Sequence, residues 1–359
     1  MRIESNLNTT IIEQANQQPK RSWRQWLIGN PLQTADMPHQ TISKTVGLAV
    51  FASDALSSTA YATQEIMMIL ALAGSGALSY TFPIAAAIAT LMVIVTVSYE
   101  QTIHAYPGGG GAYIVARDNL GELPAQTAGA ALLTDYILTV AVSISSGVAQ
   151  IVSAFPVLYG YRVIIAVSLV LLVMLINLRG VKESGKVFAI PTYIFIGLMF
   201  TTVGTGLFRY LTGTLGMVVN PPESAITSTA VAVTPFLLLH AFASGTSAMT
   251  GIEAISNGIT AFREPRSKNA GITLIWMLVI LSSLFIGISF LSGAIGTVPS
   301  EAETVISQLS RTVFGGQGIL YLAVIAGTAV ILVMAANTAF ADFPRLGALH
   351  AGDGFLPRQ

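Results

Sequence analysis

From about residue 45 onward the chain is a series of long apolar runs separated by short polar segments. A bilayer core about 30 Å thick is crossed by an α-helix of about 20 apolar residues. The pattern therefore predicts an all-α integral membrane protein with about eight spans. We place these spans at residues 45–73, 81–103, 125–154, 163–177, 187–208, 231–260, 271–296 and 318–340.

The composition agrees with this prediction and narrows the function. Hydrophobic residues make up 53% of the chain and charged residues 9%, whereas ordinary soluble domains contain about 25% charged residues. The net charge is zero, so nothing indicates a nucleic-acid partner, and the 359 residues contain no cysteine for a disulfide or a thiolate metal site. Since the sequence shows no nucleophile–base pair, metal motif or cofactor fingerprint, we expect a transporter that needs no cofactor, not an enzyme.

We expect three segments along the chain. Residues 1–44 are polar and lack the short apolar core of a signal peptide, which indicates a cytoplasmic tail. Residues 45–340 form the transmembrane domain. Residues 341–359 have the character of a polar cytoplasmic connector, so we expect further helices beyond a C-terminally truncated sequence.

The basic residues predict the orientation. Cytoplasmic loops of membrane proteins carry an excess of lysine and arginine. With the N-terminus inside and the spans alternating, 14 of the 17 basic residues fall on the inner side. The inner set is Arg2, Lys20, Arg21, Arg24, Lys44, Arg117, Arg179, Lys182, Lys186, Arg263, Arg266, Lys268, Arg345 and Arg358, and the outer set is Arg162, Arg209 and Arg311. This split predicts a cytoplasmic N-terminus in the plasma or inner membrane. A separate expectation is that the loop 297–317 could hold a surface helix.

The first and sixth spans contain small, hydroxyl and acidic residues at mid-membrane depth, in segments 53–61 and 244–253. Irregular backbone at that depth is tolerated only where protein or a wet cavity covers it. Broken helices in corresponding positions of two halves point to a transporter site. The spacing fits two inverted five-helix repeats, the second one incomplete. Small residues also allow close helix packing, which is the alternative explanation.

Three acids, Asp54, Asp135 and Glu253, lie well inside apolar spans. A charge at the bilayer centre costs at least about 2.5–3.5 kcal/mol. The spans contain no lysine or arginine at comparable depth, so a bound cation, a proton or a partner in a missing part must compensate these acids. Burial disfavours an ionised carboxylate and a bound cation favours it, so one carboxyl group can exchange a proton for a cation.

The third span adds a polar stripe of Asp135, Thr139, Ser143 and Ser146, with Tyr136 beside it. Their spacing places the stripe on one helix face. Ligands that are all oxygen suit a hard cation such as K⁺ or Na⁺. The alternative is that the hydroxyl groups bond back to their own helix.

Several motifs resemble those of known transporters. The tract YPGGGGAYIVARDNLG at 106–121, together with the broken helices, resembles the amino acid–polyamine–organocation (APC) superfamily. The segments FASDALSSTAYATQEI (51–66), TDYILTVAVSISSG (134–147) and SGTSAMTGIEAISNGITAFREP (244–265) are most similar to bacterial potassium–proton symporters of the potassium-uptake-permease type.

The resemblance implies a LeuT-like inverted-repeat (5+5) fold and a cation site between the first, third and sixth helices. It further implies a tenth-helix tyrosine that this chain does not contain. By resemblance, Glu253 carries the proton. The implied cation ligands are Asp54, Tyr61, Asp135, Tyr136, Thr139, Ser143 and Thr250.

The favoured hypothesis is therefore proton-coupled potassium uptake by alternating access, with K⁺, H⁺ and the lipid bilayer as partners and a homodimer as a possibility. An amino-acid or amine (polyamine) permease on the same scaffold is the alternative. Against an amino acid, Asp54 occupies the place where such carriers bind the substrate carboxylate. A channel-like or sensory membrane protein is a third hypothesis, but broken helices are typical of alternating access around a midplane site.

Overall fold

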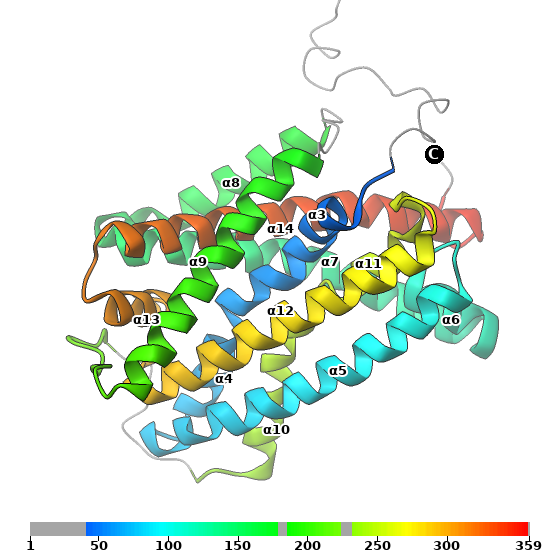
Figure 1. Cartoon of the computed structure of the whole chain (residues 1–359). Helices are drawn as coiled ribbons and strands as arrows, with labels where there is room; N and C mark the ends of the chain where they lie inside the picture. The colour runs from blue at the N-terminus through cyan, green and yellow to red at the C-terminus, as the bar shows by residue number, and fades with distance from the viewer. Residues whose placement is uncertain (1–40, 179–184, 224–231, 358–359) are drawn as a thin grey trace, which may run out of the picture.

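In the computed structural model, residues 41–178, 185–223 and 232–357 are described, and every regular element within these ranges is a helix. Most of the predicted N-terminal tail therefore lies outside the described residues. Figure 1 shows the helices packed into one bundle, with α5 and α12 running side by side. The helices are α3 (Lys44–Ser57), α4 (Ala62–Ala71), α5 (Thr81–Ala105), α6 (Gly111–Leu120), α7 (Glu122–Ala154), α8 (Arg162–Leu178), α9 (Gly185–Leu211), α10 (Pro235–Gly245), α11 (Ala254–Asn257), α12 (Arg266–Ile295), α13 (Val305–Phe314) and α14 (Ile319–Gly352).

Among the described residues, six continuous helices are long and apolar enough to cross a membrane, and they account for six of the eight predicted spans. The other two predicted spans are the pairs α3–α4 and α10–α11, in which no single helix is long enough. Helix α14 continues to Gly352, beyond the predicted end of its span at 340. The all-α membrane fold with a broken first and sixth helix is confirmed.

The first break is a short 3₁₀ turn between α3 and α4. It covers Ser58–Ala60, and Tyr61 then leaves helical geometry with φ −127° before α4 begins. Three hydroxyl groups donate to carbonyl oxygens three residues earlier, from Ser57, Ser58 and Thr59. These side chains satisfy the local backbone, so their role in the first break is structural.

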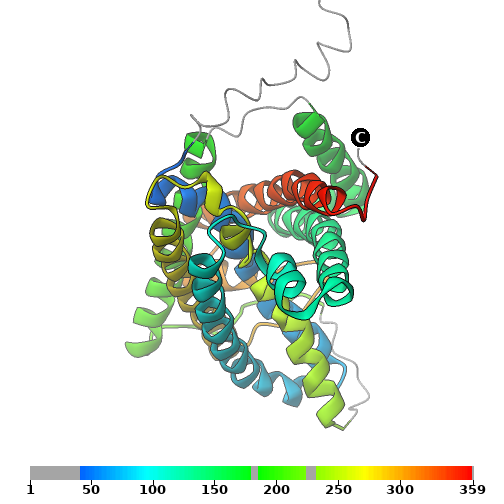
Figure 2. The same cartoon turned by 90° about the vertical axis from the view of Figure 1, so that its right-hand side faces the viewer.

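The second break is larger. Helix α10 ends at Gly245, and a 3₁₀ turn leads to Thr250, whose ψ of 142° is extended. Gly251 follows with φ +78°, a conformation that side chains disfavour. The two breaks touch, since the Ser58 hydroxyl donates to the Ala248 carbonyl at 3.0 Å. Two segments 190 residues apart are thus joined in the middle of the bundle, which Figure 2 shows from its end.

Three described arginines lie at two opposite ends of the bundle. At the end where α13 lies, Arg209 donates to the Thr312 and Val313 carbonyls and Arg311 pairs with Glu303. At the opposite end Arg117 of α6 pairs with Asp353, just beyond α14. Hydrogen bonds from Tyr113 and Arg117 lower the pKa of the Asp353 carboxyl group. This separation is the one that alternating spans require.

Helix α13 forms where a surface helix was suggested in the sequence, but most of its residues are buried. The Thr304 hydroxyl caps the helix, accepting from Ser307 N at 3.2 Å, and donates to Gln150 of α7 at 2.9 Å. The Gln64 side chain of α4 accepts from Val305 N at 3.1 Å. Helix α13 therefore covers the adjoining ends of α4 and α7 as a packed element.

Replacing Arg311 with methionine is expected to destabilise this cover. Its guanidinium lies 2.7 Å from the Glu303 carboxylate, and the two side chains are 15% and 14% exposed. Removing one partner of a largely buried pair costs up to about 3–5 kcal/mol, reduced here by the remaining solvent contact. We therefore expect a loss of about 2 kcal/mol, visible as a lower melting temperature in detergent.

Arg117→Met is the matched control. Its pair with Asp353 is more exposed, at 36% and 29%. Such pairs contribute about 0–1 kcal/mol. If both variants lowered the melting temperature equally, burial of the Arg311–Glu303 pair would not be what stabilises the α13 end.

Candidate functional site

Two buried carboxyl groups lie beside the two helix breaks. Asp54, in the last turn of α3, is 4% exposed, and Glu253, directly before α11, is 7% exposed. One oxygen of each, Asp54 Oδ1 and Glu253 Oε1, has no hydrogen-bond partner. None of the ion pairs found among the described residues includes either group. Neither carboxyl group is therefore neutralised by a basic side chain among the described residues, and each keeps one buried oxygen without a partner.

The conformation of Gly251 brings the second break against Asp54. A β-carbon at this position would lie 2.8 Å from Asp54 Oδ2 and 2.8 Å from Ala55 N. Only a glycine permits this approach with φ +78°. Gly251 is thus needed both for the shape of the second break and for its contact with the first helix.

Hydroxyl groups lie next to the carboxylates. The Tyr61 and Thr250 hydroxyl oxygens are 3.4 Å apart and connect the two broken helices. Tyr61 is 4% exposed, whereas Thr250 is half-buried. Two predicted ligands that are far apart in sequence are therefore brought together.

Helix α7 contributes a buried polar face, but it is rotated from the predicted stripe. Tyr136, Thr139 and Ser143 are 3%, 4% and 0% exposed. Asp135 and Ser146 are half-buried at the edge of this face. The Ser143 hydroxyl has no hydrogen-bond partner, so it does not bond back to its own helix.

Asp135 nevertheless belongs to the same acidic group. Its carboxyl group interacts electrostatically with those of Asp54 and Glu253. Asp342 of α14, 9% exposed, interacts with the same two. Asp342 is not among the predicted site residues, because it follows the predicted end of the eighth span by two residues.

Asn257 is a second residue of the site that is not among the predicted site residues. Its side-chain nitrogen donates to the Tyr136 hydroxyl at 3.3 Å, and its Oδ1 has no partner. The glycine tract packs directly on it, since a β-carbon at Gly109 would lie 2.8 Å from the Asn257 carbonyl oxygen and one at Gly111 would overlap Asn257 Oδ1. The tract therefore supports the site from the side, and its proximity to the sixth span could not be read from the sequence.

The site therefore combines carboxylate and hydroxyl oxygens at the meeting point of two broken helices and α7. The part of the chain that the structure describes contains no group of three or more His, Cys, Asp or Glu residues arranged to hold a metal ion. Oxygen ligands of mixed charge suit a weakly bound hard cation, and uncompensated carboxyl groups suit protons.

Fold and site together define a multi-pass membrane transporter with broken helices around a buried oxygen-lined site. The model of the amino acid permease family matches residues 43–359, and the chain belongs to this family. Its members are permeases, in agreement with the prediction of a transporter and not an enzyme.

The chain is similar to the potassium transporter KimA of Bacillus subtilis (strain 168). The two are 46% identical over 339 residues, which is 94% of this chain and 55% of the relative. The chain thus spans about half the length of that curated relative. The predicted resemblance to potassium-uptake permeases is confirmed by this match.

Proposed function

We propose that the protein takes up potassium together with protons by alternating access, with the ion held between the first, third and sixth membrane helices. Asp54, Tyr61 and Thr250 bind the cation from the two breaks. Asp135, Tyr136, Thr139 and Ser143 bind it from α7, and Glu253 carries the proton.

The observation that carries this proposal is the set of buried oxygens without partners. Asp54 Oδ1, Glu253 Oε1 and Ser143 Oγ belong to three different segments and lack hydrogen bonds. Buried polar atoms are normally satisfied, and exceptions often mark an ion or a functional group. The carboxylates also interact with one another. A monovalent cation among them would relieve this repulsion.

Coupling follows from the same arrangement. When two buried carboxyl groups repel each other, a proton on one of them removes the repulsion and leaves the other ionised to bind the cation. Glu253 lies at the more irregular break, where a change of backbone geometry can alter its exposure. Proton release from Glu253 and cation release from Asp54 are therefore linked in one movement of the second break.

A cytoplasmic N-terminus in the plasma membrane completes the proposal. It is supported by the predicted excess of basic residues on that side and by the separation of three described arginines between the two ends. Each positive charge moved inward through 100 mV gains about 2.3 kcal/mol, so the membrane potential assists uptake.

An amino-acid or amine permease is the second candidate, because the matching family model describes amino acid permeases. A substrate amine could pair with Asp54. A substrate carboxylate would instead meet Asp54 and Glu253, whose burial leaves little water to screen the repulsion. Among the described residues, no arginine or lysine forms an ion pair with either acid.

The test is growth at low potassium. The full-length protein would be expressed in bacterial cells that lack their own potassium uptake systems, with its membrane level measured by immunoblot. We expect rescue of growth, and loss of rescue for Asp135→Asn. Failure of the wild-type protein to rescue despite a normal membrane level, combined with uptake of a labelled amine, would support the second candidate instead.

A further inference from the structure

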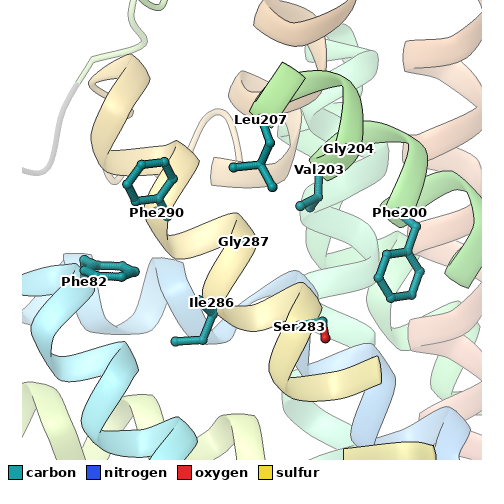
Figure 3. A pocket seen from close by; sticks show the side chains of 9 residues that line it. All are labelled: Phe82, Phe200, Val203, Gly204, Leu207, Ser283, Ile286, Gly287 and Phe290. Carbon is teal, nitrogen blue, oxygen red and sulfur yellow. The ribbon is translucent and has the colours of Figure 1, made fainter. Parts of the chain in front are cut away.

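An apolar groove lies between α5, α9 and α12, away from the ion site. Figure 3 shows the side chains around it, and the groove has a volume of about 340 Å³. Phe82, Phe200 and Phe290 border it, and Gly204 and Gly287 lie on α9 and α12 where the helix surfaces are recessed. Ligand sites in proteins have volumes of about 300–1,000 Å³, so the groove is large enough for a bound molecule.

The lining of the groove offers almost no groups that could form a hydrogen bond with a bound molecule. Its one polar side chain, Ser283, donates its hydroxyl to the Val279 carbonyl of its own helix. The remaining lining is aliphatic, aromatic or glycine. A polar solute would therefore lose hydrogen bonds on entry without regaining them, whereas a hydrocarbon would lose none.

Position in the membrane identifies the occupant. The three helices that form the groove are all candidate spans, and several side chains at its border are exposed, so the groove opens on the outer surface of the described helices at membrane depth. Phe82 starts α5, whereas Leu207 and Phe290 lie near the ends of α9 and α12. These ends are on the side of α13, as the hydrogen bonds from Arg209 to α13 show. The groove therefore faces the membrane leaflet on that side.

We propose that the groove is a binding site for one acyl chain of a membrane phospholipid from the leaflet on the α13 side. Phe82, Phe200 and Leu207 are 40%, 41% and 36% exposed, so the chain enters from the bilayer past these side chains. A recess left empty would lose dispersion contacts on all its walls. The acyl chain restores these contacts with three helices at once, which a lipid on a smooth helix face cannot do.

The glycines allow a direct test. A β-carbon at Gly204 would meet no heavy atom within 4 Å, so a larger side chain there enters the groove without a clash. Gly197 lies two turns earlier on the same helix, is equally unobstructed, and does not line the groove. Gly204→Leu thus fills the groove, and Gly197→Leu is the matched control. Ser283→Leu fills the groove from α12.

The experiment reconstitutes the full-length protein in vesicles of phosphatidylethanolamine and phosphatidylglycerol that contain a phospholipid with a photoreactive diazirine in its acyl chain. After irradiation, cross-linked peptides are identified by mass spectrometry. We expect labelling of α9 and α12 residues that line the groove, saturation with increasing probe, and loss of this labelling in Gly204→Leu and Ser283→Leu but not in Gly197→Leu.

Equal labelling of all four proteins would overturn the proposal, as would labelling that rises without saturation, because both describe lipid contact without a site. A groove occupied by a second copy of the chain would also overturn it. In that case the groove peptides would stay unlabelled in the wild-type protein and Gly204→Leu would dissociate a dimer in cross-linking. None of these outcomes depends on which solute is transported.

Discussion

Neutralising either buried carboxyl group, by Asp54→Asn or Glu253→Gln, is expected to abolish potassium accumulation. Both substitutions keep the size of a side chain that is less than 10% exposed. In Asp54→Asn, removing one partner of a buried charged contact costs about 2–5 kcal/mol, which lowers ion affinity by roughly 30-fold or more. The measurement is rubidium uptake into proteoliposomes, driven by an imposed proton gradient.

The two variants should differ in one respect. Glu253→Gln cannot release a proton, so downhill rubidium exchange persists while proton-driven accumulation is lost. Asp54→Asn loses both. Glu100→Gln is the control, since Glu100 is 37% exposed and lies 3.3 Å from His104 at the end of α5. Retention of proton-driven accumulation by Glu253→Gln would remove Glu253 from the coupling mechanism.

Gly251→Ala is expected to be equally damaging. The left-handed region costs a residue with a β-carbon about 1–2 kcal/mol. In addition, the new methyl group would lie 2.8 Å from Asp54 Oδ2 and from Ala55 N, so the two breaks must separate. We expect rubidium uptake to be lost although the protein still reaches the membrane.

Gly315→Ala is the control that separates the backbone strain from the steric clash. Gly315 has φ +74°, close to the +78° of Gly251, but its β-carbon would meet no heavy atom within 4 Å. This control therefore has the backbone strain without the clash, and it should lower the melting temperature while uptake continues. Equal loss of uptake in both variants would mean that general destabilisation, and not the contact with Asp54, causes the defect.

The sequence was sufficient for the parts of the fold and site that depend on local chemistry. Long apolar runs predict spans. Asp54 and Glu253 stand out because burying an acid within a span costs free energy, so such an acid usually has a functional role. Both helix breaks were expected from the hydroxyl, glycine and acidic residues around these two positions. The structure places the first break at Ser58–Ala60 and the second at Thr250 and Gly251.

Properties that depend on distant contacts could not be predicted. Asn257 lies near the end of the sixth span, where a polar residue is ordinarily at the membrane interface. Only the structure shows that its side chain donates a hydrogen bond to Tyr136. A surface helix could be suggested for the loop 297–317, but whether that helix meets water or protein depends on α7, α9, α12 and α14, which pack against α13. The buried face of α7 is rotated relative to the predicted stripe, so that Asp135 and Ser146 lie at its edge. Neighbouring helices set the rotation of a helix, and residue spacing alone does not predict it.

The unequal lengths of the pieces around the second break have an electrostatic consequence. An α-helix carries a partial negative charge at its C-terminal end. Helix α10 has 11 residues and ends at Gly245 near the site, whereas the four residues of α11 form too short a helix for an opposing dipole of similar size. The peptide backbone itself therefore favours positive charge at this point. A preference for cations should persist in part even when every acidic side chain of the site is neutral, and substitutions that alter affinity need not convert the protein into an anion carrier.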